Sequence, residues 1–425
     1  VWVKRTDPSG DNRSTIIGAR TDDNNYFKIR FADNDRLMVY GAKSGSTNVD
    51  IQTNREFRDT ASWLHIVLQI DTTNATETER VKWYVNGELQ ELRSTDKQYP
   101  SQNDVNHLTS ASDINIGCNA VGSPNEHFDG TMSHFHLIDG TIYAPTVFGS
   151  TDSTTGEWKI NTSPSVTYGS KGFFILKDGN SVTDQSGNGN DFTVAAGTLT
   201  NTEDCPSNNF STLINEYPSD PTGGFANGNT TAKSDADSTW RSAFSSIAKP
   251  PTGGKYYCEV KWSSGSHFIW GAVSSTTLCN NNFKDLTDAY TGEYMGYYGT
   301  NWYDNGASQG SSYGVELTSG NIGMMAMDRD NNKFWWGVNG SWGTGHNPAT
   351  NTGGVSIVGH LDDFWHFAIS TYSNSGSGVY EFNFGNGYFG TTAISSEGTN
   401  ASTIGKFEYD VPSGFTALST KGLNE

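Results

Sequence analysis

The run Lys82-Trp83-Tyr84-Val85-Asn86-Gly87-Glu88-Leu89 is bulky and β-prone until it reaches Asn-Gly. A second run, Phe334-Trp335-Trp336-Gly337-Val338-Asn339-Gly340, ends in the same dipeptide. Asn and Gly both tolerate positive φ, so Asn-Gly favours the type I′ turn that joins two antiparallel strands. Each half of the chain is therefore predicted to contain an aromatic hairpin. Two β-sandwich modules in series are expected, and such modules bind ligands more often than they catalyse reactions.

The composition agrees with an all-β chain. A length of 425 residues allows two or three domains. Aromatic residues reach 12%, which argues against disorder. Gly, Asn, Ser and Thr dominate the remainder and suit short strands joined by turns. No run keeps a 3.6-residue apolar period, so few helices are expected.

The charge balance excludes two classes of partner. Asp and Glu number 46 against 27 Lys and Arg, which gives a formal charge of −19. This excess opposes binding to a nucleic-acid backbone, which needs a basic face, and docking on anionic lipid. No apolar run is long enough to span a bilayer. We therefore expect neither nucleic-acid binding nor membrane insertion.

The cysteines and the first residues bear on the cellular setting. The four cysteines form no C-x-x-C pair, so free thiols and folding in a reducing cytosol are expected. The chain opens with Val1-Trp2-Val3-Lys4-Arg5, which is typical of the middle of a strand, and it lacks an initiator Met. Residue 1 is therefore not expected to be the natural start.

Four segments differ in their patterning. Residues 1–145 alternate β-prone runs with turns and are predicted to form the first sandwich. Residues 146–204 are rich in Ser, Thr and Gly and are expected to be a turn-rich connector with short strands. Aromatic density rises in residues 205–392, the predicted second sandwich, and residues 393–425 are expected to lead into a further module.

Both predicted sandwiches resemble known modules. The first resembles a laminin-G or concanavalin-type lectin module in Trp2-Val3-Lys4-Arg5, Trp63-Leu64-His65-Ile66, Trp83-Tyr84-Val85-Asn86-Gly87 and Phe128-Asp129-Gly130-Thr131-Met132. The second resembles a SPRY domain in Gly254-Lys255-Tyr256-Tyr257-Cys258-Glu259-Val260, Trp270-Gly271-Ala272-Val273, residues 328–340 and Phe382-Asn383-Phe384-Gly385. These resemblances imply two concanavalin-type antiparallel β-sandwiches, or jelly rolls, in tandem.

The joint between the modules carries a further resemblance. Four motifs occur in order: Phe135-His136-Leu137-Ile138-Asp139-Gly140, Thr155-Gly156-Glu157-Trp158, residues 184–192 and Pro206-Ser207-Asn208-Asn209-Phe210. This order is similar to that of large virion proteins of tailed bacteriophages from marine environments. The lectin module departs from its family because it lacks the opening strand. Either another segment completes that sheet, or its edge is paired in an oligomer.

The sequence offers no strong catalytic motif. Glycoside hydrolysis needs two facing carboxylates, and some sandwich-fold glucanases place them as Glu-x-Asp-x-x-Glu on one strand. No such run occurs here, and Glu126-His127-Phe128-Asp129, the nearest approach, is expected to be a turn before a strand. There is also no nucleophile elbow, phosphate loop or dinucleotide-binding fingerprint. We therefore expect a protein that is not an enzyme.

Two groups of residues are candidate metal ligands. Asp33 and Asp35 lie in an oxygen-rich turn, and some laminin-G modules bind Ca²⁺ through Asp and carbonyl oxygens at one rim. The alternative for these residues is Asx-turn chemistry. His134 and His136 would share one face of a strand, with His127 nearby, but two unrelated half-exposed histidines are the preferred interpretation.

A carbohydrate site is predicted in the second module. Aromatic rings alternate there with polar residues, Gly and Asn, which suggests loops. Sugar rings stack on aromatic side chains, while Asp and Asn accept hydrogen bonds from sugar hydroxyls. The predicted set is Tyr298, Trp302, Tyr303, Asp304, Asn305 and Trp342. The alternative is that about half of the rings in this segment belong to the core; they are Tyr290, Tyr294, Tyr297, Tyr298, Trp302 and Tyr303.

These expectations combine into one hypothesis with two competitors. The chain is expected to be a non-enzymatic virion surface protein, part of a tail fibre or appendage, that binds host cell-surface glycans. Other virion proteins and further copies of the chain, most simply in a trimer, would be its partners. It would fold in the host cytoplasm and end on the virion surface. The competitors are a purely structural capsid or fibre decoration protein and a polysaccharide depolymerase.

Overall fold

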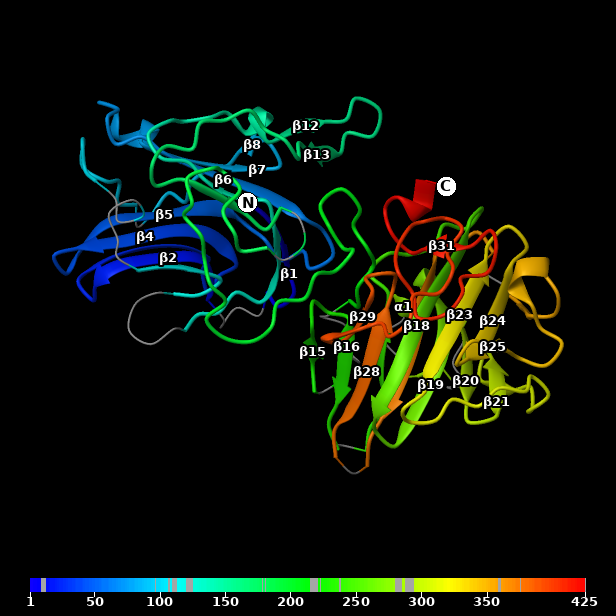
Figure 1. Ribbon diagram of the computed structural model, residues 1–425. Coiled ribbons are helices and arrows are strands. Elements are labelled where there is room, and N and C mark those ends of the chain that lie inside the picture. Colours follow the sequence, from blue (N-terminus) through cyan, green and yellow to red (C-terminus); the bar gives the residue numbers. More distant parts are fainter. Residues whose placement is uncertain are drawn as a thin grey trace. The chain divides into compact units, whose positions relative to one another are not determined.

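The computed structural model consists of two compact units, Val1–Asn201 and Thr202–Glu425. It describes all residues except 9–12, 96, 106–107, 109–112, 120–124, 178, 180, 215–220, 222, 237, 280–284, 287–293, 358–360, 375 and 425. Strands dominate both units (Figure 1). The helical elements of the described residues are α1 (Ser275–Leu278) and the 3-10 turns η1 (Glu77–Glu79), η2 (Pro145–Val147), η3 (Pro348–Thr350) and η4 (Gly422–Asn424). None of these is long and apolar enough to cross a bilayer.

The first unit is a sandwich of two five-stranded antiparallel sheets, which Figure 1 shows as separate layers. One sheet has the order β10-β1-β6-β7-β8, with bounds Gly130–Ser133, Trp2–Arg5, Leu64–Ile70, Val81–Val85 and Glu88–Leu89. The other has the order β5-β4-β3-β2-β9, with bounds Ser46–Glu56, Arg36–Lys43, Asn25–Phe31, Ser14–Asp22 and Asp113–Ile116.

Alternation along the strands decides which side chains fill the first core. Successive side chains of a strand point to opposite faces of the sheet. Phe27, Phe31 and Val39 therefore meet Ile66 and Trp83 of the other sheet in one buried cluster. In β6, Leu64, Ile66, Leu68 and Ile70 face this core, so His65, Val67 and Gln69 point to the outer face.

The predicted connector belongs to the first unit as far as Asn201. It contributes three short strands, β12 (Gly149–Thr151), β13 (Trp158–Ile160) and β14 (Phe173–Ile175). Strand β12 pairs with β13, and β14 pairs with β11 (Phe135–Leu137), which precedes the connector. Trp158 donates its indole N–H to Nδ1 of His65 at 3.1 Å, and His65 stacks on Trp2. The connector thus covers the outer face of the β10-β1-β6-β7-β8 sheet.

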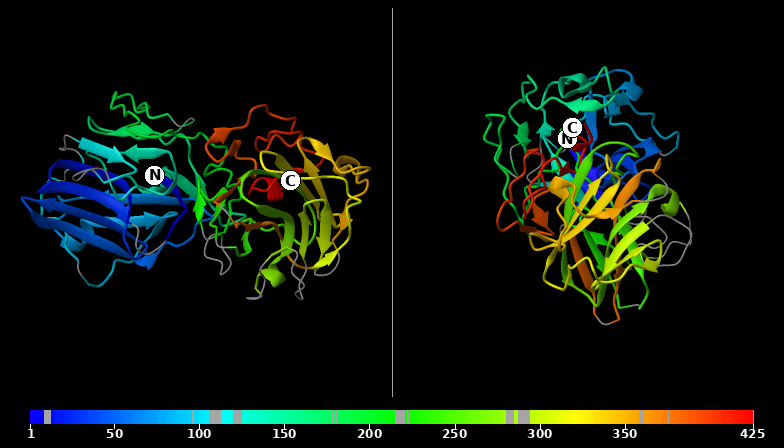
Figure 2. Two further views of the ribbon diagram at one scale, coloured as in Figure 1. Left: turned by 90° about the horizontal axis from the view of Figure 1, so that it is seen from below. Right: turned by 90° about the vertical axis from the view of Figure 1, so that its right-hand side faces the viewer.

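The second unit also has two main sheets (Figures 1 and 2). The larger has the order β15-β16-β28-β18-β23-β24-β25, with bounds Phe225–Ala226, Thr231–Ser234, Gly378–Asn383, Lys255–Ser264, Ile322–Asp328, Lys333–Val338 and Ser341–Trp342. It is joined by β26 (Val355–Ser356) and β31 (Thr416–Ala417). The smaller has the order β17-β27-β19-β20-β21-β22, with bounds Arg241–Phe244, Trp365–Tyr372, His267–Ser274, Tyr294–Tyr298, Asn301–Asp304 and Ala307–Ser308. A separate hairpin pairs β29 (Tyr388–Phe389) with β30 (Thr392–Ala393).

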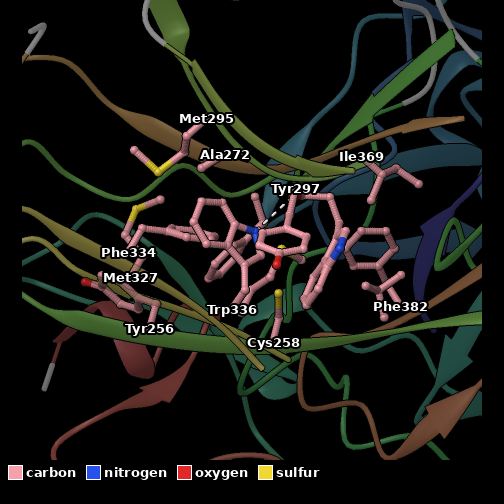
Figure 3. Close-up of a cluster of buried hydrophobic side chains, with 14 of the residues drawn as sticks. Tyr256, Cys258, Ala272, Met295, Tyr297, Met327, Phe334, Trp336, Ile369 and Phe382 are labelled. Atoms are coloured by element: carbon pink, nitrogen blue, oxygen red, sulfur yellow. Dashed lines mark hydrogen bonds between the residues drawn. The ribbon is translucent and has the colours of Figure 1, made fainter. Parts of the chain in front are cut away.

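Aromatic residues fill the space between these two sheets. Figure 3 shows Met295 and Ile369 of the smaller sheet facing Tyr256 and Cys258 of the larger one. Trp336 lies between them and is fully buried. Its indole N–H donates to the backbone carbonyl of Trp270 in the opposite sheet at 2.9 Å, so a buried polar group is satisfied across the sandwich.

The segment 393–425, expected to lead into a further module, packs against the outer face of the larger sheet of the second unit. Phe407, Val411 and Phe415 form a buried cluster with Tyr257 and Trp335 of that sheet. Strand β31 runs parallel to β18 and pairs with it. Each unit therefore has one sheet whose outer face is covered by a long segment with little regular structure. The all-β prediction of two antiparallel sandwiches with few helices is confirmed.

Candidate functional site

The outer face of the β5-β4-β3-β2-β9 sheet carries an aromatic and charged surface. In β3 the alternation that sends Phe27 and Phe31 to the core sends Tyr26, Lys28 and Arg30 to this face. Lys28 pairs in register with Tyr40 of β4, so the two side chains are cross-strand neighbours. The period of two is visible in the sequence of residues 25–31, but no sequence motif marks this face as a site.

Two tyrosines and one lysine form the centre of this surface. The rings of Tyr26 and Tyr40 lie 6.0 Å apart between centroids and are tilted by 30°. Nζ of Lys28 lies 5.9 Å from the centroid of Tyr26 and 6.0 Å from that of Tyr40. Burial, reinforced by the neighbouring Tyr40, raises the pKa of Tyr26 to about 12. The Tyr26 phenol is therefore neutral at physiological pH and can donate a hydrogen bond.

Glu126 completes the surface from a neighbouring turn. Its carboxylate accepts hydrogen bonds from Nζ of Lys28 at 3.1 and 3.3 Å and from Arg30 at 2.9 Å, and Arg13 lies 3.6 Å away. Burial acts to raise the pKa of Glu126, but Arg30 and Lys28 outweigh it and the pKa is lowered. Burial and Arg30 together lower the pKa of Lys28. Glu126 is thus an ionised acceptor, whereas a general acid needs a raised pKa.

The two aspartates predicted to bind calcium have other partners. Asp35 is buried, and its oxygens accept hydrogen bonds from Arg5 and Arg58, each at 3.0 Å. Asp33 is exposed and pairs with Arg13 at 3.5 Å. A carboxylate whose two oxygens hold arginines is a structural ion pair, so Asp35 is not arranged as a calcium ligand. The prediction missed this because Arg5 and Arg58 are distant from Asp35 in sequence.

The candidate metal ligands His134 and His136 also contact other side chains. His134 is buried, and its Nδ1 lies 2.7 Å from the hydroxyl of Ser133. His136 stacks on Phe174, and burial lowers its pKa to about 2. Across the described parts of the chain, no group of three or more His, Cys, Asp or Glu side chains is arranged to hold a metal ion.

The six residues predicted to bind carbohydrate do not form one surface. The expected loops are the strands β20 and β21, joined to β22 by a turn at Asn305. Trp302 is partly buried against the core between the sheets, and Trp342 is partly buried on the larger sheet near Tyr257. Tyr303 pairs with Gly296, Asp304 ends β21, and Oδ1 of Asn305 accepts the N–H of Tyr294 at 2.9 Å. Of the neighbouring rings in this segment, Tyr294 and Tyr297 are fully buried, and Tyr290 lies outside the described residues.

Tyr298 belongs instead to a ring cluster that the sequence did not indicate. It lies on the outer side of the smaller sheet beside Trp240, His267 and Tyr372, and all four rings are half-buried. The hydroxyl of Tyr298 lies 3.2 Å from Nδ1 of His267, and Trp240 lies 5.2 Å from Tyr372 between centroids. These residues come from four separate segments, so no local sequence motif indicates that they lie together.

Comparisons with known proteins agree with the architecture of the first unit. Residues 1–148 match the family model Laminin_G_3, which describes the concanavalin A-like lectin/glucanases superfamily. The first unit is thus a concanavalin-like jelly roll. The chain also resembles the crystal structure of the SPRY domain of human HERC1, with 14% identity over 36% of this chain and 87% of that one, at a TM-score of 0.27. No curated protein matches this sequence.

Proposed function

We propose that this chain is a carbohydrate-binding protein without catalytic activity, and that its first unit binds saccharides on the outer face of the β5-β4-β3-β2-β9 sheet. The observation that carries the proposal is the pair Tyr26 and Tyr40 beside Lys28 and Glu126. This pair lies in a unit whose sequence matches a lectin and glucanase superfamily.

The chemistry of this face suits a sugar. Tyrosine rings offer apolar surface to the C–H groups of a sugar ring, and their hydroxyls offer hydrogen bonds. Lys28 and Arg30 are largely buried and donate to Glu126, which is an ionised and partly exposed acceptor. A site of this kind gives weak affinity per copy, and several copies on one assembly supply avidity.

A second surface supports contact with a glycan through the other unit. The cluster of Trp240, His267, Tyr298 and Tyr372 offers four half-buried rings with polar edges. It retains one residue of the predicted set, Tyr298, and we propose it as an auxiliary saccharide surface. Trp302 and Trp342 are not part of it.

The biological setting is a further part of the proposal. We propose that the chain belongs to a tail fibre or another appendage of a phage particle, acts as a trimer beside other virion proteins, and binds glycans of the host cell surface. The support is the order of its modules and joint motifs in sequence. A Ca²⁺ site in the first unit stays a prediction without a ligand set among the described residues.

A glycan array with the whole chain tests the proposal. Wild-type protein is expected to bind at least one oligosaccharide. Tyr26→Ala and Tyr40→Ala are each expected to weaken that binding roughly tenfold, because each removes a stacking ring and its hydroxyl. Tyr84→Ala is the matched control, since Tyr84 is a half-buried tyrosine of β7 in the opposite sheet.

Three outcomes of the array separate the alternatives. A blank array with and without Ca²⁺ would favour the structural decoration protein. Glycan binding that is unchanged in both tyrosine variants would show that the saccharide site lies on another surface. Shortening of a bound polysaccharide by the purified chain would support the depolymerase hypothesis.

A further inference from the structure

The charged side chains beside Tyr26 form ion pairs with one another. Arg20 of β2 is the cross-strand neighbour of Tyr26, so the two side chains lie on the same outer face of the sheet. The guanidinium of Arg20 pairs with Asp23 at 3.2 Å and with Asp113 of β9 at 3.9 Å. Two carboxylates therefore flank this cation.

A second group of ion pairs on the same face centres on Glu126. Lys28 and Arg30 share its carboxylate. Arg13 lies 3.6 Å from the same carboxylate and 3.5 Å from that of Asp33. Together the two groups contain four cations and four carboxylates, so their formal charges cancel.

The carboxylates are the more exposed members of the pairs around Arg20. The side chain of Arg20 is 24% exposed, whereas those of Asp23 and Asp113 are 74% and 62% exposed. Solvent therefore reaches the carboxylate oxygens more readily than the guanidinium that they hold.

The pairs around Glu126 have the same order of exposure. Lys28 and Arg30 are both buried more deeply than Glu126, which covers their charges. Asp50, the cross-strand neighbour of Tyr40 on β5, adds a half-buried carboxylate to this part of the face. A molecule that approaches the two tyrosine rings therefore meets carboxylates more readily than cations.

This order of exposure opposes acidic saccharides. A sulfate or carboxylate on a sugar gains affinity from cations that it can reach and loses affinity beside like charges. The cations of this face are held beneath or beside carboxylates. An uncharged sugar ring avoids the repulsion and still finds aromatic surface and acceptors for its hydroxyls.

We infer that the ligand of this face is an uncharged saccharide and that Glu126 determines the selectivity against acidic ones. This inference rests on the saccharide face proposed above. Glu126 has the role because both buried cations, Lys28 and Arg30, donate to it. Without its charge, the positive charges of Lys28, Arg30 and Arg13 would attract an acidic group to the rings.

Paired polysaccharides test this selectivity on the whole chain. The pairs are dextran with dextran sulfate, laminarin with laminarin sulfate, and the best uncharged oligosaccharide of the glycan array with its sulfated form. Biolayer interferometry measures the affinity for each member. In every pair that binds, wild-type protein is expected to bind the uncharged member at least about tenfold more tightly. Raising the salt concentration from about 50 mM to about 500 mM should leave the binding of that member unchanged, because it forms no ion pair.

Two isosteric substitutions separate the local charge of the face from the net charge of the protein. Glu126→Gln is expected to narrow the wild-type preference at least about threefold. Glu79→Gln is the matched control, because it removes the same charge from an exposed ion pair with Lys82, outside this face, and it should leave the preference unchanged. If Glu126→Gln does not fold or binds neither member, Asp23→Asn replaces it, because it uncovers the charge of Arg20 at an exposed position.

The results distinguish the inference from the function on which it rests. Sulfated members that bind as tightly as the uncharged ones would overturn the inference and leave saccharide binding standing. An equal effect of Glu126→Gln and Glu79→Gln, or no effect of either, would show that Glu126 does not set the selectivity. A wild-type protein that binds no member of any pair and no glycan of the array would overturn the proposed function, and the inference with it.

Discussion

In this protein, the Asn at the first position of a hairpin turn also holds the neighbouring strand by hydrogen bonds. Among the described residues, three two-residue hairpin turns are Asn-Gly with both residues at positive φ. In each, the Asn backbone N–H donates to a carbonyl of the adjacent strand, and its Oδ1 accepts the N–H of that same residue. The pairs are Asn86 with His65, Asn305 with Tyr294 and Asn339 with Ile322. The residue thus fixes both the turn and the neighbouring strand.

Substitutions at Asn86 separate these two roles. Asn86→Ala is expected to lower the free energy of unfolding by about 2 kcal/mol, because it strains the left-handed backbone and loses the side-chain acceptor. Asn86→Gly keeps the backbone conformation and is expected to cost about 1 kcal/mol. Denaturant unfolding measures both values. Equal costs for Ala and Gly would contradict the backbone part of this explanation.

The ion pair of Asp35 gives a second prediction for single residues. Asp35→Asn leaves Arg5 charged and buried, so we expect a loss of about 3 kcal/mol in the free energy of unfolding. Arg58→Ala removes a partner that is 59% exposed and is expected to cost less than about 1 kcal/mol. Denaturant unfolding of the two variants compares the buried and the exposed partner. A larger effect from Arg58 would show that Arg5 is not the essential partner.

At the scale of elements, the sequence predicts the hairpins, but it does not predict which side chains gather on the outer faces of the sheets. Residues 82–89 and 334–340 form the hairpins expected from Asn-Gly. The same dipeptide occurs at Asn305-Gly306, where loops are predicted and the structure has the strands β20 and β21. The period of two in β3 predicts that Tyr26 and Lys28 share the outer face. Glu126 is distant from them in sequence, so only the folded structure shows that it contacts Lys28. The cluster at Trp240 depends on strand order, which no local pattern reveals.

Strand β18 and the segment that covers it depend on one buried carboxylate. Glu259 accepts the backbone N–H groups of Glu408 and Tyr409 at 3.0 and 2.8 Å, the hydroxyl of Tyr257 and the amide of Asn383. Burial raises the pKa of Glu259 to about 7 from an ordinary value of 4.5, although these four donors lower it. The covering segment is therefore attached through a group that titrates near neutrality.

This attachment predicts a pH dependence of the second unit. Between pH 4.5 and about 7, folded Glu259 keeps a proton that the unfolded chain has released. Its contribution to stability is thus present at low pH and is lost as pH rises through this window, by roughly 3 kcal/mol. Thermal unfolding across the window measures the slope. Glu259→Gln should flatten it, and an unchanged slope would assign the titration to another group.

At the scale of the whole molecule, the chain divides into two units with separate cores. Each unit combines a sandwich with its own covering segment, residues 146–201 in the first and 393–425 in the second. The sequence led to boundaries at 145, 204 and 392 because both covering segments lack a strong strand pattern. Contacts distant in sequence, such as Trp158 with His65, attach them to their sandwiches.

Separate cores predict separate unfolding. Differential scanning calorimetry of the whole chain is expected to show two transitions. Asn86→Ala should move only one of them, and Glu259→Gln should change the pH dependence of only the other. A single transition that moves with both substitutions would show that the units unfold together.

The position of a bound oligosaccharide tests the central claim most directly. A crystal of the whole chain, soaked with the best ligand from the glycan array, should show a sugar ring against Tyr26 and Tyr40 within hydrogen-bonding distance of Lys28 or Glu126. A sugar bound only at another surface, or a saturating soak that leaves this face without sugar, would contradict the account.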